Sequence, residues 1–255
     1  MAPEAVVGLL AVGGPFSLEV SGPADPNVVL FLAHGFGVRR DARGLFPAIR
    51  AAVDPDVLVV CPDLADPSAR GTRAVRLSHQ AARIEAARRF VEAHYVGSSF
   101  YSYHPLQSVY ITHSQGALAL ALARPHGATV VLLAPPLGPV FHRFIRVPGW
   151  SRLGSSLTLS GTSQLVRSDG SVTEVPQGFW DDLLHADATQ LYRRLVRENR
   201  VFVVQAGDDR VVGPEPPPAR ATSRTLAGAD HDFSGRSRAG LVALLEKLGL
   251  PVRSR

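Results

Sequence analysis

The chain has 255 residues, 45% of them hydrophobic, which allows one large domain with a sizeable core and excludes an intrinsically disordered protein. The formal charge is +5, but nearly all the cations are arginines scattered over expected helices. This pattern predicts a solvated surface, because nucleic-acid binding requires a concentrated basic face. The single cysteine, Cys61, excludes an intramolecular disulfide and a thiolate-rich zinc site.

Signals for membranes, export and metals are weak in this sequence. No apolar run approaches the length of a membrane span. The apolar segment from Ala5 to Val12 follows Glu4 with no Lys or Arg before it, which argues against a secretory signal. No His, Asp and Glu cluster has metal-ligand spacing. We therefore expect a cytoplasmic monomer or homodimer that binds no metal, cofactor or nucleic acid and does not insert into a membrane.

Apolar strands alternate with helices along most of the chain. The expected strands are Phe16–Val20, Val28–Ala33, Asp56–Cys61, Ser108–Thr112, Ala128–Leu133, Val201–Gln205 and Ala221–Leu226. The expected helices are Asp41–Val53, Arg73–His94, an alanine-rich helix ending near Ala123, Thr189–Arg197 and Arg236–Leu248. This alternation predicts a single α/β domain over residues 1–255, with a mostly parallel sheet covered by helices on both faces.

The alternation breaks after the expected strand Ala128–Leu133, at the position of strand 6 of the expected fold. Residues 137–188 carry both tryptophans and a predicted hairpin, Gln164–Arg167 with Ser171–Val175, around Asp169-Gly170. Long segments of this kind are usually lids or binding elements, so we expect a cap insertion over the ligand site. The ligand itself should bind beyond the carboxyl ends of the strands.

The strongest chemical signal is Thr112-His113-Ser114-Gln115-Gly116, where an apolar strand meets a small-residue helix at a serine. A nucleophile elbow requires such a sharp turn, which lifts the serine hydroxyl off the sheet. Taken alone, Ser114 is equally consistent with an ordinary helix N-cap.

A second turn, His34-Gly35-Phe36-Gly37, follows an earlier buried strand at the same edge of the expected sheet. Acyl transfer places negative charge on the former carbonyl oxygen, and fixed backbone N–H groups stabilise it. We expect the Phe36 and Gln115 amides to form this oxyanion hole. The alternatives are a glycine-rich strand-to-helix turn without chemistry and a phosphate-binding turn. The phosphate-binding alternative is weak, because neither G-x-G-x-x-G nor G-K-[ST] is present.

The partners of the serine follow from chain order and loop context. His231 is the only histidine after residue 185, and it lies in a loop between the last strand and the last helix. Asp209 follows the expected strand Val201–Gln205. A buried carboxylate at this position can accept a hydrogen bond from the imidazole N–H and hold the histidine in one tautomer. We prefer it to Asp208 because Val211 and Val212 would anchor its loop.

The chain resembles the α/β-hydrolase superfamily over about residues 16–248. The resemblance rests on His34-Gly35-Phe36-Gly37, on Ser114 in His-Ser-Gln-Gly, on Asp209 in Asp-Asp-Arg-Val-Val and on His231 in Gly-Ala-Asp-His-Asp-Phe. Within it, the chain is similar to bacterial carboxylesterases of the cinnamoyl/feruloyl-esterase type and to the serine aminopeptidase and monoacylglycerol-lipase-like branch. It departs from many relatives by having Thr112 and Ala117 in place of two glycines.

The resemblance and the residues together predict a serine esterase for small-molecule esters, acting through a Ser114-His231-Asp209 triad and an acyl-enzyme. Phe179, Trp180, Trp150 and His34 are candidate substrate-binding residues, and the aromatic ones are as consistent with packing of the insertion. Peptidase, lipase or thioesterase activity would use the same chemistry. A non-catalytic binding protein of this fold is the competing class, and it would have lost a member of the triad.

Overall fold

The computed structural model describes residues 4–10, 14–96, 106–145, 154–167, 169–213 and 215–254. Its centre is an eight-stranded sheet in the order β1-β2-β4-β3-β7-β8-β11-β12. The strands are β1 Glu4–Leu10, β2 Gly14–Ser21, β3 Val28–Ala33, β4 Val57–Pro62, β7 Gln107–His113, β8 Thr129–Leu133, β11 Arg200–Ala206 and β12 Thr222–Leu226. Strands β1 and β2 pair antiparallel, and all pairs from β4 to β12 are parallel.

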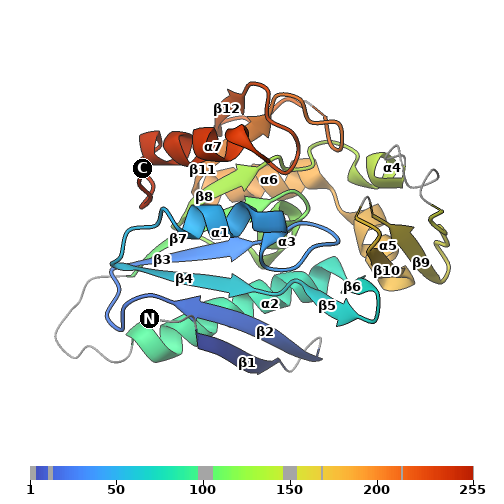
Figure 1. Cartoon of the computed structure of the whole chain (residues 1–255), viewed down its shortest axis with the longest axis horizontal. Helices are drawn as coiled ribbons and strands as arrows, with labels where there is room; N and C mark the ends of the chain where they lie inside the picture. The colour runs from blue at the N-terminus through green and yellow to red at the C-terminus, as the bar shows by residue number, and fades with distance from the viewer. Residues whose placement is uncertain are drawn as a thin grey trace.

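Helices cover both faces of this sheet, as expected from its continuously apolar strands (Figure 1). One face carries α1 (Leu45–Arg50) and α7 (Arg236–Lys247), which pack on each other. The other carries α2 (Leu77–Val91), α3 (Gly116–Ala123) and α6 (Ala188–Glu198), with α3 between the other two. Each face buries its own apolar cluster.

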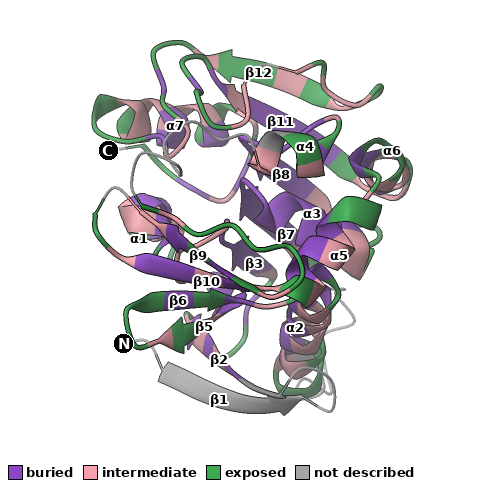
Figure 2. Ribbon diagram, turned by 90° about the vertical axis from the view of Figure 1, so that its right-hand side faces the viewer, coloured by how far each residue is buried: buried purple, intermediate pink, exposed green. Residues whose placement is uncertain are grey.

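A second sheet of four short strands, in the order β5-β6-β10-β9, lies beyond the carboxyl ends of β3 and β4 (Figure 1) and in front of β3 in the end-on view (Figure 2). It joins β5 (Ala65–Ser68) and β6 (Gly71–Ala74) to β9 (Thr162–Val166) and β10 (Val172–Pro176). Helices α4 (Val140–Ile145) and α5 (Gln177–His185) flank it.

The parallel pairing of β6 with β10 joins two distant parts of the chain, and a glycine permits it. Gly71 has φ +153°, and a Cβ built on it would lie 2.6 Å from the Val172 carbonyl oxygen. Any side chain at this position would therefore clash with the neighbouring strand.

The predicted α/β architecture is confirmed, including the hairpin at Asp169-Gly170 and the break after β8, the sixth strand of the large sheet in chain order.

The expected helix Arg73–His94 was wrong at both ends. Its first residues belong to β6, and a π-helical turn, Glu92–Val96, comes after its last α-helical residue. The expected helix Asp41–Val53 is a 3-10 turn, Ala42–Gly44, followed by the shorter α1. Strands β1, β5 and β6 were not predicted. Among the described helices, none is long and apolar enough to cross a membrane.

Candidate active site

Ser114 lies in the tight turn between β7 and α3, with a left-handed φ of +52°. Its amide donates to the Leu133 carbonyl at 2.8 Å, which fixes the turn against β8. A Cβ on Gly116 would lie 2.4 Å from the His34 carbonyl oxygen, so only glycine lets the helix approach β3 this closely. The strained serine is therefore held by the packing around it.

Three side chains predicted to act together lie in one chain of hydrogen bonds. His231 Nε2 is 2.9 Å from Ser114 Oγ, and His231 Nδ1 is 2.7 Å from Asp209 Oδ2. Because the ionised carboxylate only accepts hydrogen bonds, the imidazole proton is on Nδ1. The Nε2 lone pair is then available to the serine hydroxyl proton.

Asp209 is fixed on both carboxylate oxygens. Its Oδ1 accepts from the amides of Val211 at 2.8 Å and Val212 at 3.0 Å. Burial alone would raise the pKa of Asp209, but the hydrogen bond and charge of His231 and these two amides outweigh it, and the pKa is lowered. Asp208 is exposed at the surface. The structure thus brings Asp209 to the imidazole, but the loop is held by the backbone amides of Val211 and Val212 and not by apolar anchoring, since the Val211 side chain is exposed.

His34 is buried, and both of its ring nitrogens have partners. The Leu64 amide donates to Nε2 at 2.7 Å, so the proton is on Nδ1, which donates to the Gly35 carbonyl at 2.9 Å. Burial lowers the pKa of His34 and keeps the ring neutral. In a trans peptide the carbonyl and the next N–H point in opposite directions, so His34 turns the Phe36 amide away from itself. The ring therefore orients the turn, and its nitrogens are not available to a ligand.

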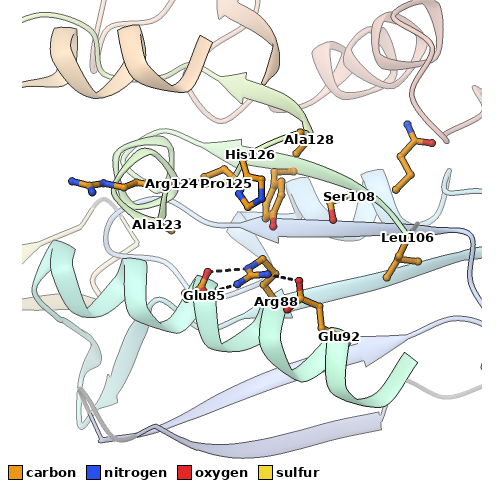
Figure 3. A pocket seen from close by; sticks show the side chains of 13 residues that line it. Glu85, Arg88, Glu92, Leu106, Ser108, Ala123, Arg124, Pro125, His126 and Ala128 are labelled. Atoms are coloured by element: carbon orange, nitrogen blue, oxygen red, sulfur yellow. Dashed lines mark hydrogen bonds and ion pairs between the residues drawn. The ribbon is translucent and has the colours of Figure 1, made fainter. Parts of the chain in front are cut away.

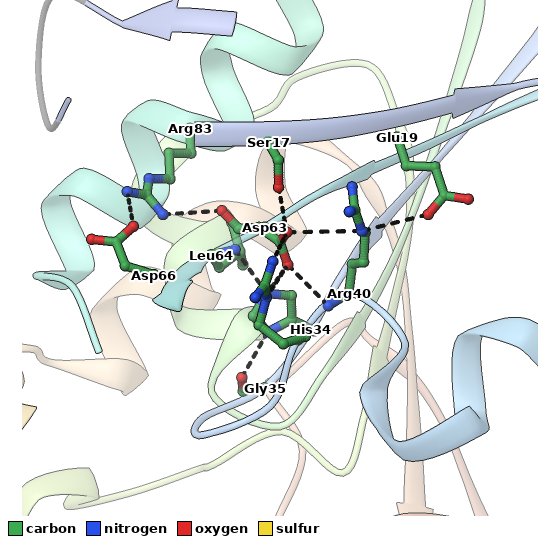
Figure 4. A network of polar contacts seen from close by, with 10 residues as sticks. Ser17, Glu19, His34, Gly35, Arg40, Asp63, Leu64, Asp66 and Arg83 are labelled. Carbon is green, nitrogen blue, oxygen red and sulfur yellow. Dashed lines mark hydrogen bonds and ion pairs between the residues drawn. The ribbon is translucent and has the colours of Figure 1, made fainter. Parts of the chain in front are cut away.

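Beneath this turn lies a buried carboxylate, Asp63, at the centre of a polar network (Figure 4). It accepts from the Ser17 hydroxyl, from the Arg39 guanidinium at 2.8 and 3.1 Å, and from the Arg40 amide at 3.1 Å. Burial would raise the pKa of Asp63, but Arg39 and Ser17 together lower it to about 2. The network fixes the segment after β4 against the segment after β3.

Gln115 is anchored by its side chain, whose amide nitrogen donates to Gln80 Oε1 at 2.8 Å. Its backbone N–H is at the start of α3, next to Ser114. Among the described residues, no backbone carbonyl accepts a hydrogen bond from it. This donor therefore remains available at the helix N-terminus, where negative charge is favoured.

Phe179 and Trp180 are both buried, and the Trp180 indole N–H donates to Ser163 Oγ at 3.1 Å. The Phe179 ring centroid is 5.3 Å from that of Phe36, and both pack against Phe144. The aromatic residues thus fasten the insertion to the turn at Phe36. Phe36 and Phe144 are only partly buried, whereas Phe179 and Trp180 are buried.

Sequence reasoning missed Asp63, Phe144 and the supporting contact of His113. His113 Nε2 donates to the His231 backbone carbonyl at 2.8 Å, so it supports the loop of the imidazole. Burial, reinforced by the neighbouring His231, lowers the pKa of His113 to about 4. Asp63 comes directly after the carboxyl end of a buried strand, a signal that would have found it. Trp150 lies outside the described residues.

Cavities lie at both the carboxyl and the amino ends of the strands of the large sheet. One, of about 430 Å³, is beside His231 and is lined by Asp208, Arg210, Val211, Gly228, Asp230 and Asp232 as well. The other, of about 630 Å³, includes Gln107 and Ser108 at the start of β7 (Figure 3). Seven strand residues at about 3.3 Å each separate it from Ser114 by roughly 20 Å. Its Arg88 is paired with Glu85 and Glu92, so its charges are satisfied internally.

The fold is shared with solved structures over nearly the whole chain. The esterase domain from a Rhodothermus marinus protein has a TM-score of 0.67 and 20% identity, over 98% of this chain and 97% of that one. Est1E from Butyrivibrio proteoclasticus has a TM-score of 0.62 and 15% identity, over 96% and 97%. An alpha-beta serine hydrolase homologue from Coxiella burnetii has a TM-score of 0.57 and 16% identity, over 96% and 98%. No protein-family model and no curated protein matches the sequence. Identities this low show a common fold.

Proposed function

We propose that this chain, which has the α/β-hydrolase fold, is a serine esterase that hydrolyses small carboxylic esters. The observation that carries the proposal is the His231 imidazole, which bridges the Ser114 hydroxyl at 2.9 Å and the Asp209 carboxylate at 2.7 Å. A serine hydroxyl is a weak nucleophile until a base in hydrogen-bond contact takes its proton, and this contact is already formed.

In the first half of the reaction, Ser114 Oγ attacks the ester carbonyl carbon while its proton passes to His231 Nε2. The Phe36 and Gln115 amides stabilise the negative charge that develops on the carbonyl oxygen. Asp209 keeps the imidazole in the required tautomer and stabilises the imidazolium. The carbon–oxygen bond to the leaving alcohol then breaks, and the proton on Nε2 goes to that alcohol.

In the second half, a water molecule attacks the acyl-serine and gives its proton to His231 Nε2. The bond to Ser114 Oγ breaks, the proton returns to the serine, and the acid leaves.

We further propose that residues 137–188 act as a cap that determines substrate choice. The support is their position: the hairpin β9–β10 and helix α5 lie beyond the carboxyl ends of the strands, where ligands bind in parallel sheets. Phe179 contacts the ring of Phe36, whose amide is one of the proposed oxyanion donors. A bulky acyl or aryl group would therefore meet the cap.

We propose esters, rather than amides or thioesters, as substrates because of what the structural neighbours are called. Several are esterases, and Est1E has been seen with ferulic acid bound. The test is a panel of 4-nitrophenyl esters of increasing length, hydroxycinnamate esters, aminoacyl anilides and an acyl thioester. We expect ester turnover that Ser114→Ala reduces by roughly 10⁵-fold or more.

Fluorophosphonate labelling followed by peptide mass spectrometry checks the nucleophile independently. We expect modification of Ser114, and loss of labelling in Ser114→Ala with the fold intact by circular dichroism. Ser168→Ala is the matched control, because Ser168-Asp169-Gly170 has the same Ser-x-Gly spacing. Labelling of another serine, or esters untouched while anilides or thioesters turn over, would overturn the esterase assignment.

A further inference from the structure

A guanidinium lies against the turn that carries the proposed oxyanion donor. Arg167 comes directly after β9, and its guanidinium carbon is 5.8 Å from the ring centroid of Phe36. A Cβ built on Gly37 would lie 2.7 Å from Arg167 Nη1. The cap thus brings a positive charge against the turn at Phe36-Gly37, which precedes α1.

Within the part of the chain that the structure describes, this charge has no anionic partner in contact. Among the described residues, no carboxylate oxygen lies within 4.0 Å of the Arg167 guanidinium, and no oxygen accepts a hydrogen bond from it. By contrast, the buried Arg83 pairs with Asp66 at 2.6 Å. Arg167 is half-buried, so it loses part of its hydration while no carboxylate compensates for that loss, and an arginine in this position is expected to bind an anion.

The charged groups around Arg167 do not supply a carboxylate in contact with it. Burial, together with the nearby Arg43, lowers the pKa of Arg167 to about 10, and the group stays charged at neutral pH. The two nearby acids are occupied or solvated: Asp232 pairs with Arg43 at 3.2 Å, and the side chain of Asp169 is 59% exposed. Two guanidinia therefore face this region, and only one of them has a carboxylate in contact.

We propose that Arg167 binds an ionised carboxylate on the substrate, so that the enzyme prefers esters that carry a second, free carboxyl group. The proposal rests on the esterase function above. A guanidinium fork matches a carboxylate through two parallel N–H···O bonds, which gives both affinity and orientation. The carboxylate belongs to the acyl group or to the alcohol, and the test distinguishes the two.

The test compares charged and neutral esters of matched shape. For the acyl side, mono-4-nitrophenyl adipate is compared with its methyl ester. For the alcohol side, 4-acetoxybenzoate is compared with methyl 4-acetoxybenzoate. The measured quantity is the ratio of kcat/KM between charged and neutral members, in the wild type, Arg167→Gln and Arg167→Lys. Arg70→Gln is the control, since Arg70 is exposed in the turn between β5 and β6 and its side chain donates to Gln164.

We expect one of the two pairs to favour the charged ester in the wild type. Arg167→Gln should reduce that ratio by about 10- to 100-fold, because hydrogen bonds to charged groups are the strong ones. Arg167→Lys should keep part of the preference, and Arg70→Gln all of it. A wild-type ratio at or below one for both pairs, or a ratio that Arg167→Gln leaves unchanged, would overturn the proposal.

Failure of the esterase function gives a different result, namely no turnover of any ester. In that case, an NMR titration of the wild type and Arg167→Gln with monomethyl adipate still tests the anion site. Saturable binding that is lost in Arg167→Gln supports it, and equal binding to both, or none to the wild type, overturns it. Thermal melts of each variant show that the cap has kept its fold.

Discussion

Two neighbouring aspartates provide the sharpest test at the scale of single residues. Asp209 contacts His231, whereas Asp208 is exposed. Asp209→Asn should lower kcat by about 10⁴-fold, because an amide presents an N–H to the imidazole and favours the wrong tautomer. Asp208→Asn should change kcat less than about threefold, since ordinary surface changes have small effects. Steady-state kinetics on one 4-nitrophenyl ester gives both values, and an equal loss in the two variants would exclude Asp209 as the orienting acid.

Asp63 gives a prediction for stability and its pH dependence. Its pKa is about 2 in the folded protein against an ordinary 3.8. This lowered pKa contributes about 2 kcal/mol to the unfolding free energy at neutral pH. Asp63→Asn should lose at least that amount, as measured by urea unfolding at pH 7.

The sign of the pH effect is set by the lowered pKa. The contribution of Asp63 is fully present above the unfolded pKa and disappears as pH falls through the folded one. The difference in unfolding free energy between wild type and Asp63→Asn should therefore be constant near neutrality and begin to shrink below about pH 4. A difference that grows as the pH falls through this window would contradict the assignment.

Some of these residues could be predicted from local sequence, and others could not. Ser114 has a strand before it and a small-residue helix after it, and His231 is the only histidine in the last part of the chain, so both were found. Phe144 and Arg167 reach the site through the folding of the insertion, whose path the local pattern does not give. Asp63 was missed because a carboxylate at a strand end is also a common turn residue.

At the scale of elements, the crossing of α3 over β3 depends on one glycine. A Cβ at position 116 would lie 2.4 and 2.5 Å from the carbonyl oxygens of His34 and Ala33, both fixed backbone atoms. Gly116→Ala should therefore lower the unfolding free energy by about 3 kcal/mol or more.

Gly240 in α7 is the matched control for this substitution. A Cβ there meets only Leu226, at 3.5 Å, which is an ordinary contact. Gly240→Ala should raise the unfolding free energy by about 0.5–1 kcal/mol, because alanine loses less backbone entropy in a helix. Equal destabilisation by the two substitutions would show that the close approach of α3 to the backbone after β3 does not require glycine at position 116.

Phe144 should influence which substrates are accepted. It contacts Phe36 and Phe179 from α4 and is more exposed than either Phe179 or Trp180. Phe144→Ala should change the ratio of kcat/KM between a 4-nitrophenyl acetate and a bulky aryl ester by about tenfold, since apolar contacts of this size discriminate substrates. Leu184→Ala, at an exposed position of α5, should leave the ratio unchanged. A ratio unaffected by Phe144→Ala would show that this ring only packs the cap.

The small sheet explains why the helix prediction failed at its start. The residues before Leu77 fit the same helical spacing as the residues of α2, but Gly71–Ala74 pair with β5 and β10 instead. One of these partners lies about a hundred residues later, and no local pattern indicates such a pairing. The strands of the large sheet were predicted well because buried parallel strands are continuous apolar runs.

At the scale of the whole molecule, the cap and the main sheet share one core. Leu165, Val175, Phe179 and Trp180 belong to the same buried cluster as strand residues such as Val29. We therefore expect the cap and sheet to unfold together. Both tryptophans lie in the insertion, so fluorescence reports on the cap while far-ultraviolet circular dichroism reports on the whole chain.

The two probes should give the same denaturant midpoint, which is the usual test of two-state unfolding. Trp150→Phe isolates the signal of Trp180 and should not separate the transitions. An earlier fluorescence transition, with most of the helical signal retained, would show that the cap melts by itself.

The pairing of β6 with β10 also limits how the cap can be transplanted between proteins. Residues 137–188 are contiguous, so a graft of that segment alone would be the natural first choice. Its strand β10 would arrive without Gly71, whose missing side chain admits the Val172 carbonyl. A working chimera has to carry residues 65–74 together with the insertion, so the two segments have to be transferred together.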